Sequence, residues 1–251
     1  MLEYWNNLKQ SITQYYQGFK YSYDMSIRDT FGVSFPRSGR HWMSVMLELY
    51  HGGPALSDLF RDENASFTHR NSWTHEDALT FNGKRVLYIY RNPLDVMFSL
   101  HTHYSTYDPL IPETRHFPTD DPDISHIEAR LKGWMNRWAK HVIKWVFEPP
   151  RGCKERLILT YEQMVVDTEE CLAKAVEFIW RKKPQPLRCQ ACVEATTREL
   201  MMLLHPQEPR ITKIHRKEDK EAFLNKYRHL IITCIGDNRI FDLYPELSKG
   251  V

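Results

Sequence analysis

The alternation of hydrophobic and polar residues predicts a strand, a tight turn and a helix over residues 30–50. Residues 32–35 alternate small and apolar side chains, and Pro36 ends the strand because it has no N–H for a sheet ladder. Ser38 and Gly39 suit the turn, since glycine is free at φ and both residues are common in turns. Beyond the turn, apolar residues recur at the spacing of one helix face: Trp42, Val45, Met46 and Leu49. The turn should therefore lie at the amino end of this helix.

The same pattern recurs in residues 84–104. Residues 85–90 are a β-branched and aromatic run of strand length, and Arg91, Asn92 and Pro93 end it. Pro93 suits the first turn of a following helix. Ser99 comes eight residues after Arg91, which is about two helical turns, so the two side chains can face the same side.

The remaining pattern completes one α/β domain over residues 1–251. It predicts a helical apolar stripe within residues 1–29, helices at 127–147, 171–179 and 191–204, and a buried strand at 156–161. Residues 105–126 contain four prolines and no period, so they form either an acceptor lid or a disordered loop. A chain of 251 residues can form one such domain. We predict a mostly parallel central sheet flanked by helices.

The first turn carries candidate chemistry for binding an anion. The amino end of a helix has free N–H groups and a positive dipole, and Arg37 and Arg40 add charge there. The Walker A pattern is not met, because Arg40 and His41 follow Gly39 in place of Lys and Ser or Thr. No hydroxyl is therefore ready to hold Mg²⁺. On this turn alone, a surface turn with two arginines is an equally good interpretation, and Arg91 alone could be a solvated arginine.

Together the two turns resemble the signature of sulfotransferases that use 3′-phosphoadenylyl sulfate (PAPS). In that family a PKSGTTW or PRSGTTW segment binds the 5′-phosphosulfate, and an R-N-P-x-D-V-x-x-S segment binds the 3′-phosphate through its Arg and Ser. Here the segments read PRSGRHW at 36–42 and RNPLDVMFS at 91–99. The resemblance implies a P-loop-like nucleotide-binding fold, with Trp42 against the adenine. The cofactor contacts it implies at these segments are Arg37, Ser38, Gly39, Arg40, His41, Trp42, Arg91 and Ser99.

The resemblance continues toward the carboxyl end of the chain. Tyr161 begins a YEQ that matches the family's YED, whose Tyr lies near the adenine, and Thr196 matches a family Thr near the cofactor. Arg216 and Lys217 match the start of the R-K-G element that wraps the 3′-phosphate. Glu218 stands where that element has glycine, which argues against close backbone approach to the phosphate there.

The same resemblance implies a general base at His69. Thr68-His69 precedes the second strand as the family's K-T-H element does, although Phe67 replaces its Lys. A neutral imidazole with a pKa of about 6.5 can accept a proton at neutral pH. The alternative histidines are His41, His75, His101 and His103.

Composition excludes several other classes. A net charge of +2, without a long basic run, argues against nucleic-acid or membrane surfaces. The first thirty residues contain no secretory h-region, and no apolar run reaches the roughly 18 residues of a spanning helix, so we expect a soluble, cytoplasmic protein. Five cysteines are an odd set that suits a reducing compartment. Cys189 and Cys192 form a lone C-x-x-C, better explained as neighbouring helix positions than as a metal or redox site.

These observations predict sulfuryl transfer from PAPS to a hydroxyl or amine of a small-molecule acceptor, giving adenosine 3′,5′-bisphosphate. Arg37 and the helix N–H groups would stabilise the leaving phosphate while His69 takes the acceptor proton. We expect no metal, whereas a kinase would need Mg²⁺ and a Walker-type Lys. A non-catalytic nucleotide-binding protein would keep Arg91 and Ser99 but would have no use for His69. The acceptor and the oligomeric state cannot be read from the sequence.

Overall fold

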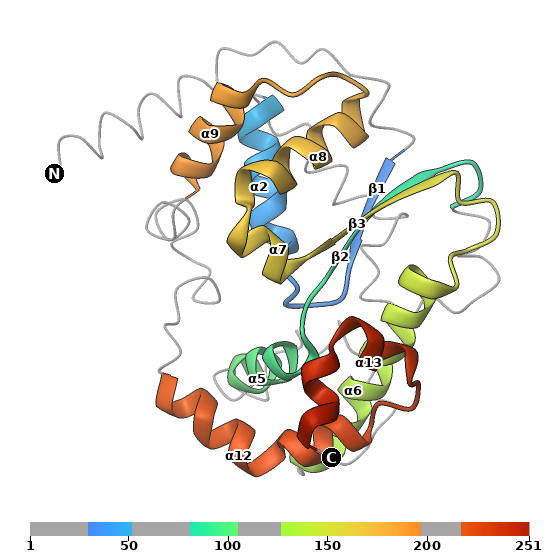
Figure 1. Cartoon of the computed structure of the whole chain (residues 1–251), viewed down its shortest axis with the longest axis vertical. Helices are drawn as coiled ribbons and strands as arrows, with labels where there is room; N and C mark the ends of the chain where they lie inside the picture. The colour runs from blue at the N-terminus through green and yellow to red at the C-terminus, as the bar shows by residue number, and fades with distance from the viewer. Residues whose placement is uncertain (1–29, 52–80, 105–126, 197–216, 251) are drawn as a thin grey trace, which may run out of the picture.

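A computed structural model describes residues 30–51, 81–104, 127–196 and 217–250 (Figure 1). Its strands are β1 (Thr30–Ser34), β2 (Arg85–Tyr90) and β3 (Glu155–Thr160), which form one parallel sheet in the order β1-β2-β3. The register pairs Ser34 with Ile89 and Tyr90 with Thr160, so the three carboxyl ends meet at one edge. The described part therefore has the predicted α/β class, with a parallel sheet flanked by helices.

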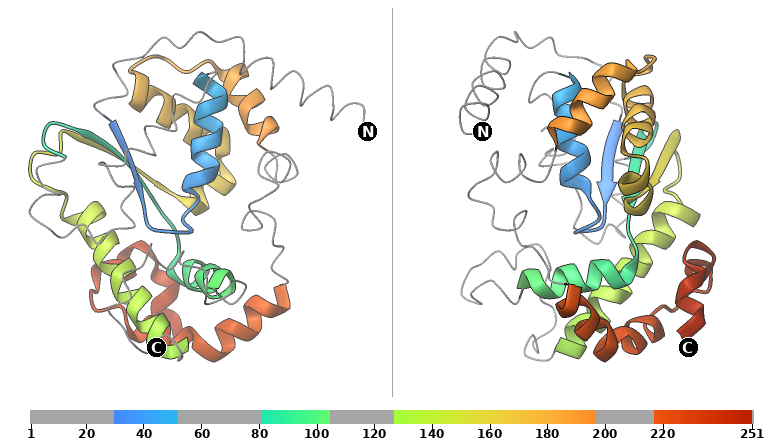
Figure 2. Two further views of the ribbon diagram at one scale, coloured as in Figure 1. Left: turned by 180° about the vertical axis from the view of Figure 1, so that it is seen from behind. Right: turned by 60° about the vertical axis from the view of Figure 1, so that its left-hand side comes forward.

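The helices gather in two groups around this sheet (Figures 1 and 2). The first group contains α2 (Arg40–His51), α7 (Tyr161–Val166), α8 (Thr168–Trp180) and α9 (Pro186–Ala195). The second contains α5 (Pro93–Tyr104), α6 (Ile127–Val142), η4 (Ile143–Phe147), α12 (Lys217–Thr233), α13 (Arg239–Leu243) and η5 (Pro245–Gly250). None of the described helices is both long and apolar enough to cross a membrane.

Strand β2 joins the two hydrophobic cores because its side chains alternate between the two faces of the sheet. Leu87 and Ile89 pack with the first group of helices, whereas Val86, Tyr88 and Tyr90 pack with the second. All six residues of β2 are buried, as expected for a central parallel strand. The tryptophans of α6 and η4 belong to the core, since Trp134, Trp138 and Trp145 are all buried.

Two predicted boundaries were wrong for local reasons. The helix predicted at 191–204 begins earlier, at Pro186, because proline is suited to the first position of a helix. Within the described residues it ends at Ala195. The strand predicted at 156–161 ends at Thr160, whose hydroxyl accepts a hydrogen bond from the Gln163 N–H at 3.0 Å. The Gln163 side chain in turn accepts from the Thr160 N–H, so this capping box starts α7 at Tyr161.

The C-x-x-C pair lies on one side of α9. Cys189 and Cys192 are free, buried thiols that pack in the core formed with α2 and α8. Burial raises the pKa of Cys189 and raises that of Cys192 to about 11. The two cysteines are neighbouring buried positions of one helix, as predicted, and a thiol with a raised pKa is a poor nucleophile at neutral pH.

A buried arginine attaches α8 to the sheet. Arg85, at the start of β2, donates hydrogen bonds to the carbonyl oxygens of Phe178 and Ile179, the latter at 3.0 Å. These carbonyls belong to the last turn of α8, where a helix has no backbone donors of its own. The Arg85 guanidinium therefore supplies hydrogen-bond donors to carbonyl oxygens at the carboxyl end of α8 inside the core.

A buried histidine makes the stability of the fold depend on pH. His141 on α6 shares a hydrogen bond of 2.8 Å, through its Nδ1, with the Tyr88 hydroxyl. Burial, with a smaller contribution from the Lys144 charge, lowers the pKa of His141 to about 3. Below about pH 6.5 the unfolded chain therefore binds a proton at this residue that the folded chain does not bind.

We predict that this histidine lowers the free energy of unfolding by about 2 kcal/mol between pH 7 and pH 5. Urea unfolding at both pH values should show that loss in the wild-type chain and a smaller one in His141→Gln. The exposed His229 on α12 is the matched control, and His229→Gln should keep the wild-type loss. Equal losses in wild type and His141→Gln would contradict the assignment.

Candidate functional site

The candidate site lies at the carboxyl edge of the sheet, where each strand leads into one of the segments singled out in the sequence. β1 leads into residues 35–39, β2 into Arg91 and Asn92, and β3 into Tyr161. Open α/β sheets bind ligands beyond the carboxyl ends of their strands. The parallel register therefore brings the predicted contacts together although they are distant in sequence.

The first turn has the backbone of an anion-binding nest. Arg37 has a φ of 67° and Gly39 a φ of 90°, whereas Ser38 between them is not in the positive-φ region. Alternating signs of φ are typical of nests, in which successive N–H groups point toward one anion. The sequence placed the turn at Ser38 and Gly39, but the positive φ that accompanies Gly39 is at Arg37. The Ser38 hydroxyl is buried and has no hydrogen-bond partner within the described ranges.

The Tyr161 ring lies directly on Gly39. A Cβ atom at Gly39 would lie 2.5 Å from Tyr161 Cδ2, which is closer than real Cβ atoms come to other atoms. A second contact comes from Arg91, whose guanidinium carbon lies 4.1 Å from the centre of the same ring. The ends of all three strands thus meet at the Tyr161 ring, which contacts Gly39 and forms a cation–π contact with Arg91.

Arg91 and Ser99 both converge on Arg37. Arg91 Nη1 donates a hydrogen bond to the Arg37 carbonyl oxygen at 3.2 Å. The Arg37 side chain donates from Nε to the Ser99 hydroxyl at 2.9 Å. Arg91 Nε is buried and has no acceptor among the described residues. The two sequence segments therefore form one cationic cluster, with a donor still available at Arg91.

The other predicted contacts of the first turn begin α2. Trp42 is half-buried, and its ring centre lies 6.2 Å from that of Tyr161 at a tilt of 60°. Burial lowers the pKa of Arg40 to about 10, so its guanidinium stays charged at neutral pH. His41 lies in the first turn of the helix.

Several predicted contacts do not join this cluster. Thr196 is buried at the end of α9, where its hydroxyl donates to the Val193 carbonyl oxygen at 3.1 Å. The Lys217 side chain is 87% exposed and lies 3.7 Å from Glu221 on the same helix. His69 and Arg216 lie outside the described residues, as does the alternative base His75.

The element that the family resemblance implied at Arg216 and Lys217 continues into helix α12 from Lys217 onward. Glu218 and Glu221 occupy helical positions, because neither is the glycine that a loop close to a phosphate requires. Phe223 is buried against Phe98 and stacks on His101 at 5.1 Å. Burial, together with the charge of Arg130, lowers the pKa of His101.

Sequence reasoning missed three acidic and basic residues around the cluster. Asp95 lies 3.7 Å from Arg91 and 2.5 Å from Lys220 on α12. The Glu162 carboxylate accepts a hydrogen bond of 2.8 Å from the Asn92 N–H. The spacing of four residues between Arg91, just before α5, and Asp95 in its first turn was a usable signal. Lys220 and Glu162 have no such signal, since their partners are distant in sequence.

Comparison with known proteins identifies the class to which this fold and cluster belong. Residues 58–229 match the sulfotransferase domain, so the chain belongs to that family, as the sequence predicted. The match begins after the first turn, whose assignment therefore depends on its own geometry. The proposed single domain over 1–251 stays a prediction.

Two individual relatives support the family. The chain is 24% identical over 185 residues to a 3-alpha-hydroxysteroid sulfotransferase of Cavia porcellus. This alignment covers 62% of this chain and 61% of that protein. The aligned region is thus less than two thirds of the relative's length. A crystal structure of mouse sulfotransferase SULT7A1 complexed with PAP superposes with a TM-score of 0.50 and 16% identity, covering 96% of this chain and 94% of the other. This likeness confirms the predicted sulfotransferase fold.

The contact between Gly39 and Tyr161 leads to a prediction about stability. Gly39→Ala should lower the free energy of unfolding by about 2–4 kcal/mol, because the new Cβ adds a clash to the strain of positive φ. Gly83→Ala is the matched control, since Gly83 has a φ of 70° but open space around its Cβ position. Chemical denaturation of both variants measures the difference.

A double-mutant cycle isolates the clash. Gly39→Ala should cost less stability in a Tyr161→Ala background than in the wild type, because the ring that meets the new Cβ is gone. If Gly39→Ala costs no more than Gly83→Ala, the ring does not constrain this position.

Proposed function

We propose that this protein transfers the sulfuryl group of PAPS to a hydroxyl or amine of a small-molecule acceptor, releasing adenosine 3′,5′-bisphosphate. The observation that carries the proposal is the convergence of Arg91 and Ser99 on Arg37, in a chain that belongs to the sulfotransferase family. The PAP named in the mouse sulfotransferase structure supports the same class of nucleotide. Five free thiols fit action in the reducing cytoplasm.

The residues present suit a nucleotide with two anionic ends. The buried Ser38 hydroxyl and Arg91 Nε lack partners in the described part of the chain, and phosphate oxygens would accept hydrogen bonds from both. Arg91 and Ser99 would hold the 3′-phosphate, while the turn and the amino end of α2 would hold the phosphosulfate. The residues that we assign to cofactor binding are Arg37, Ser38, Gly39, Arg40, His41, Trp42, Arg91, Ser99, Tyr161, Thr196, Arg216 and Lys217.

Thr196 and Lys217 receive weaker support than the rest. The Thr196 hydroxyl already bonds within α9, and the Lys217 side chain reaches solvent. Both would have to change their contacts to bind the nucleotide. Lys220, which reaches Asp95 beside Arg91, adds positive charge closer to the cluster.

The reaction follows from where charge develops. The bond between sulfur and the 5′-phosphate oxygen breaks as a bond between sulfur and the acceptor oxygen or nitrogen forms. The electron pair of the broken bond stays on the phosphate, where Arg37 and the N–H groups of the turn stabilise it. The acceptor proton passes to His69. Arginine is a poor proton donor, so this site relies on electrostatic stabilisation of the leaving phosphate, and we propose no metal.

The first functional prediction tests whether Arg91 binds the 3′-phosphate of the nucleotide or its phosphosulfate group. Arg91→Ala should weaken PAPS binding about tenfold or more, because a charge-assisted hydrogen bond contributes about 1.5–3 kcal/mol. Adenosine 5′-phosphosulfate, which lacks the 3′-phosphate, should bind the wild type and the variant almost equally. Calorimetric titration of both nucleotides measures the two losses.

Arg181→Ala is the control for that titration, since Arg181 is an exposed arginine paired with Glu155 away from the cluster. It should bind both nucleotides as the wild type does. Ser99→Ala removes one hydroxyl without truncating a cation and should show a smaller loss for PAPS. If Arg91→Ala weakens both nucleotides equally, it disturbs the turn as a whole and the 3′-phosphate assignment is wrong.

The second functional prediction tests the reaction and its base together. Mass spectrometry of a metabolite extract incubated with PAPS and the wild-type protein should detect products that have gained SO₃. With an acceptor found in this way, His69→Ala should lower kcat by about 10²–10⁴ with little change in PAPS binding. Absence of any sulfated product would favour the non-catalytic nucleotide-binding alternative.

A pH profile distinguishes His69 from the other histidines. The neutral imidazole is the active form, so wild-type kcat/KM should fall below a pKa near 7, and His69→Ala should lose that acidic limb. His101→Ala is the matched control and should keep it. Because burial lowers the pKa of His101, a limb displaced to lower pH that disappears in His101→Ala would transfer the role to His101.

A further inference from the structure

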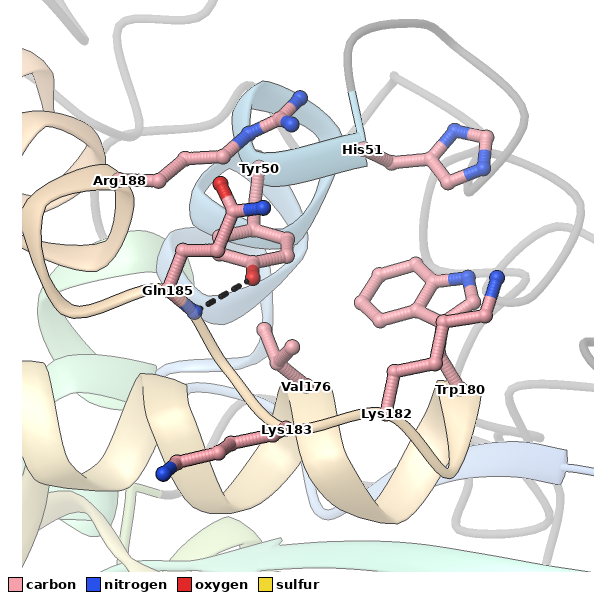
Figure 3. A pocket seen from close by; sticks show the side chains of 8 residues that line it. All are labelled: Tyr50, His51, Val176, Trp180, Lys182, Lys183, Gln185 and Arg188. Atoms are coloured by element: carbon pink, nitrogen blue, oxygen red, sulfur yellow. Dashed lines mark hydrogen bonds between the residues drawn. The ribbon is translucent and has the colours of Figure 1, made fainter.

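A pocket lies at the opposite end of α2 from the candidate site (Figure 3). It has a volume of about 470 Å³ and is lined by the last residues of α2, one face of α8, the segment that leads into α9, and the first turn of α9. Helix α2 is about 18 Å long, at 1.5 Å per residue. A ligand here would therefore be well separated from the turn at Gly39.

The wall of this pocket is a stack of aromatic rings around Trp180. The Tyr50 ring lies 6.0 Å from it at 29°, and the His51 ring lies 5.4 Å from it at 12°. The Tyr50 hydroxyl accepts a hydrogen bond of 3.0 Å from the Gln185 N–H, which holds the segment between α8 and α9 against the ring. Val176, one turn before Trp180 on α8, adds an apolar surface (Figure 3).

The Trp180 indole has an unused donor. The side chain is only 6% exposed, and its Nε1–H is buried without an acceptor among the described residues. Buried polar groups in folded proteins are nearly always hydrogen-bonded, so each exception requires an explanation. An oxygen atom of a ligand in this pocket would supply the missing acceptor.

The charges around the pocket all have one sign. Lys182, Lys183 and Arg188 line it, and no carboxylate is among its lining residues in the described chain. Neither lysine makes an ion pair with a described residue. The Arg188 guanidinium lies 5.1 Å from the centre of the Tyr50 ring. Three cations beside an indole donor give this pocket the chemistry of an anion site.

Hydrogen bonds to the end of α8 do not account for Lys182 and Lys183. The carboxyl ends of α2 and α8 carry partial negative charge, which attracts basic residues. In α8, however, Arg85 already donates to the Phe178 and Ile179 carbonyls, and the Arg181 N–H donates to the Glu177 carbonyl at 2.8 Å. The last turn of α8 thus has its own partners without Lys182 or Lys183.

We propose that this pocket binds a small organic anion, consisting of an aromatic ring that bears one carboxylate, sulfate or phosphate group. An anionic oxygen accepts the Trp180 Nε1–H and pairs with Lys182, while the ring of the ligand packs against the aromatic stack of Tyr50, Trp180 and His51. This site is separate from the proposed nucleotide site, and the inference does not rest on the proposed function.

Titration calorimetry with 4-nitrobenzoate tests the site, with the neutral 4-nitrobenzamide as the uncharged probe. The wild type should bind the acid and not the amide, and excess adenosine 3′,5′-bisphosphate should leave this binding unchanged. Lys182→Gln and Trp180→Phe should each weaken binding about tenfold, since each loses one charge-assisted contact. Lys174→Gln changes a lysine on α8 outside the pocket and should bind as the wild type does.

Four results would overturn the proposal. They are no binding of 4-nitrobenzoate to the wild type, equal binding of the amide, unchanged binding in both pocket variants, or an equal loss in Lys174→Gln. Inorganic sulfate that binds as tightly as 4-nitrobenzoate would reject the aromatic part of the ligand. Because Lys182 is exposed, Lys182→Gln should remain folded even if Trp180→Phe is destabilised.

Discussion

The space above Gly39 is filled by the Tyr161 ring, and this single contact constrains the whole edge of the sheet. The turn after β1 can approach the end of β3 only because Gly39 has no side chain. Arg91 from β2 then lies against the same ring and also bonds the backbone of the turn. The three strand ends are thus held in one arrangement before any ligand is present, which is the preorganisation that an electrostatic site needs.

Strand β2 is buried on both faces, and its packing in the core fixes the position of this edge of the sheet. Its alternating side chains contact both groups of helices, so neither group can shift without disturbing the strand that carries Arg91. Polar groups inside this core are used for attachment. Arg85 holds the end of α8, and the hydrogen bond between Tyr88 and His141 links β2 to α6. Such buried polar contacts favour one packing over alternatives, because each leaves a group unsatisfied if the elements move.

The local pattern of the sequence was sufficient for the elements of this edge. Pro36 and Gly39 bounded the turn, apolar spacing gave α2 and α5, and the two segments at 36–42 and 91–99 indicated the family. Contacts between elements could not be predicted, because they depend on which side chains the fold brings together. The positive φ of Arg37, the Tyr161 ring on Gly39 and the pairing of Lys220 with Asp95 are all of this kind. The segment that begins at Lys217 is helical, since it lacks the glycines of the family element.

Asp95 gives the carboxyl-terminal part of the chain a thermodynamic link to the sheet edge. Its carboxylate lies between two cations, closer to Lys220 at 2.5 Å than to Arg91 at 3.7 Å. An anion bound at Arg91, as we propose, would compete with Asp95 for that guanidinium and would leave the carboxylate more fully to Lys220. Occupancy of the edge would then strengthen the attachment of α12 to α5, and by reciprocity a firmly docked α12 would raise the affinity of Arg91 for the anion. Ligand retention and the docking of a helix remote in sequence would then be linked through one carboxylate.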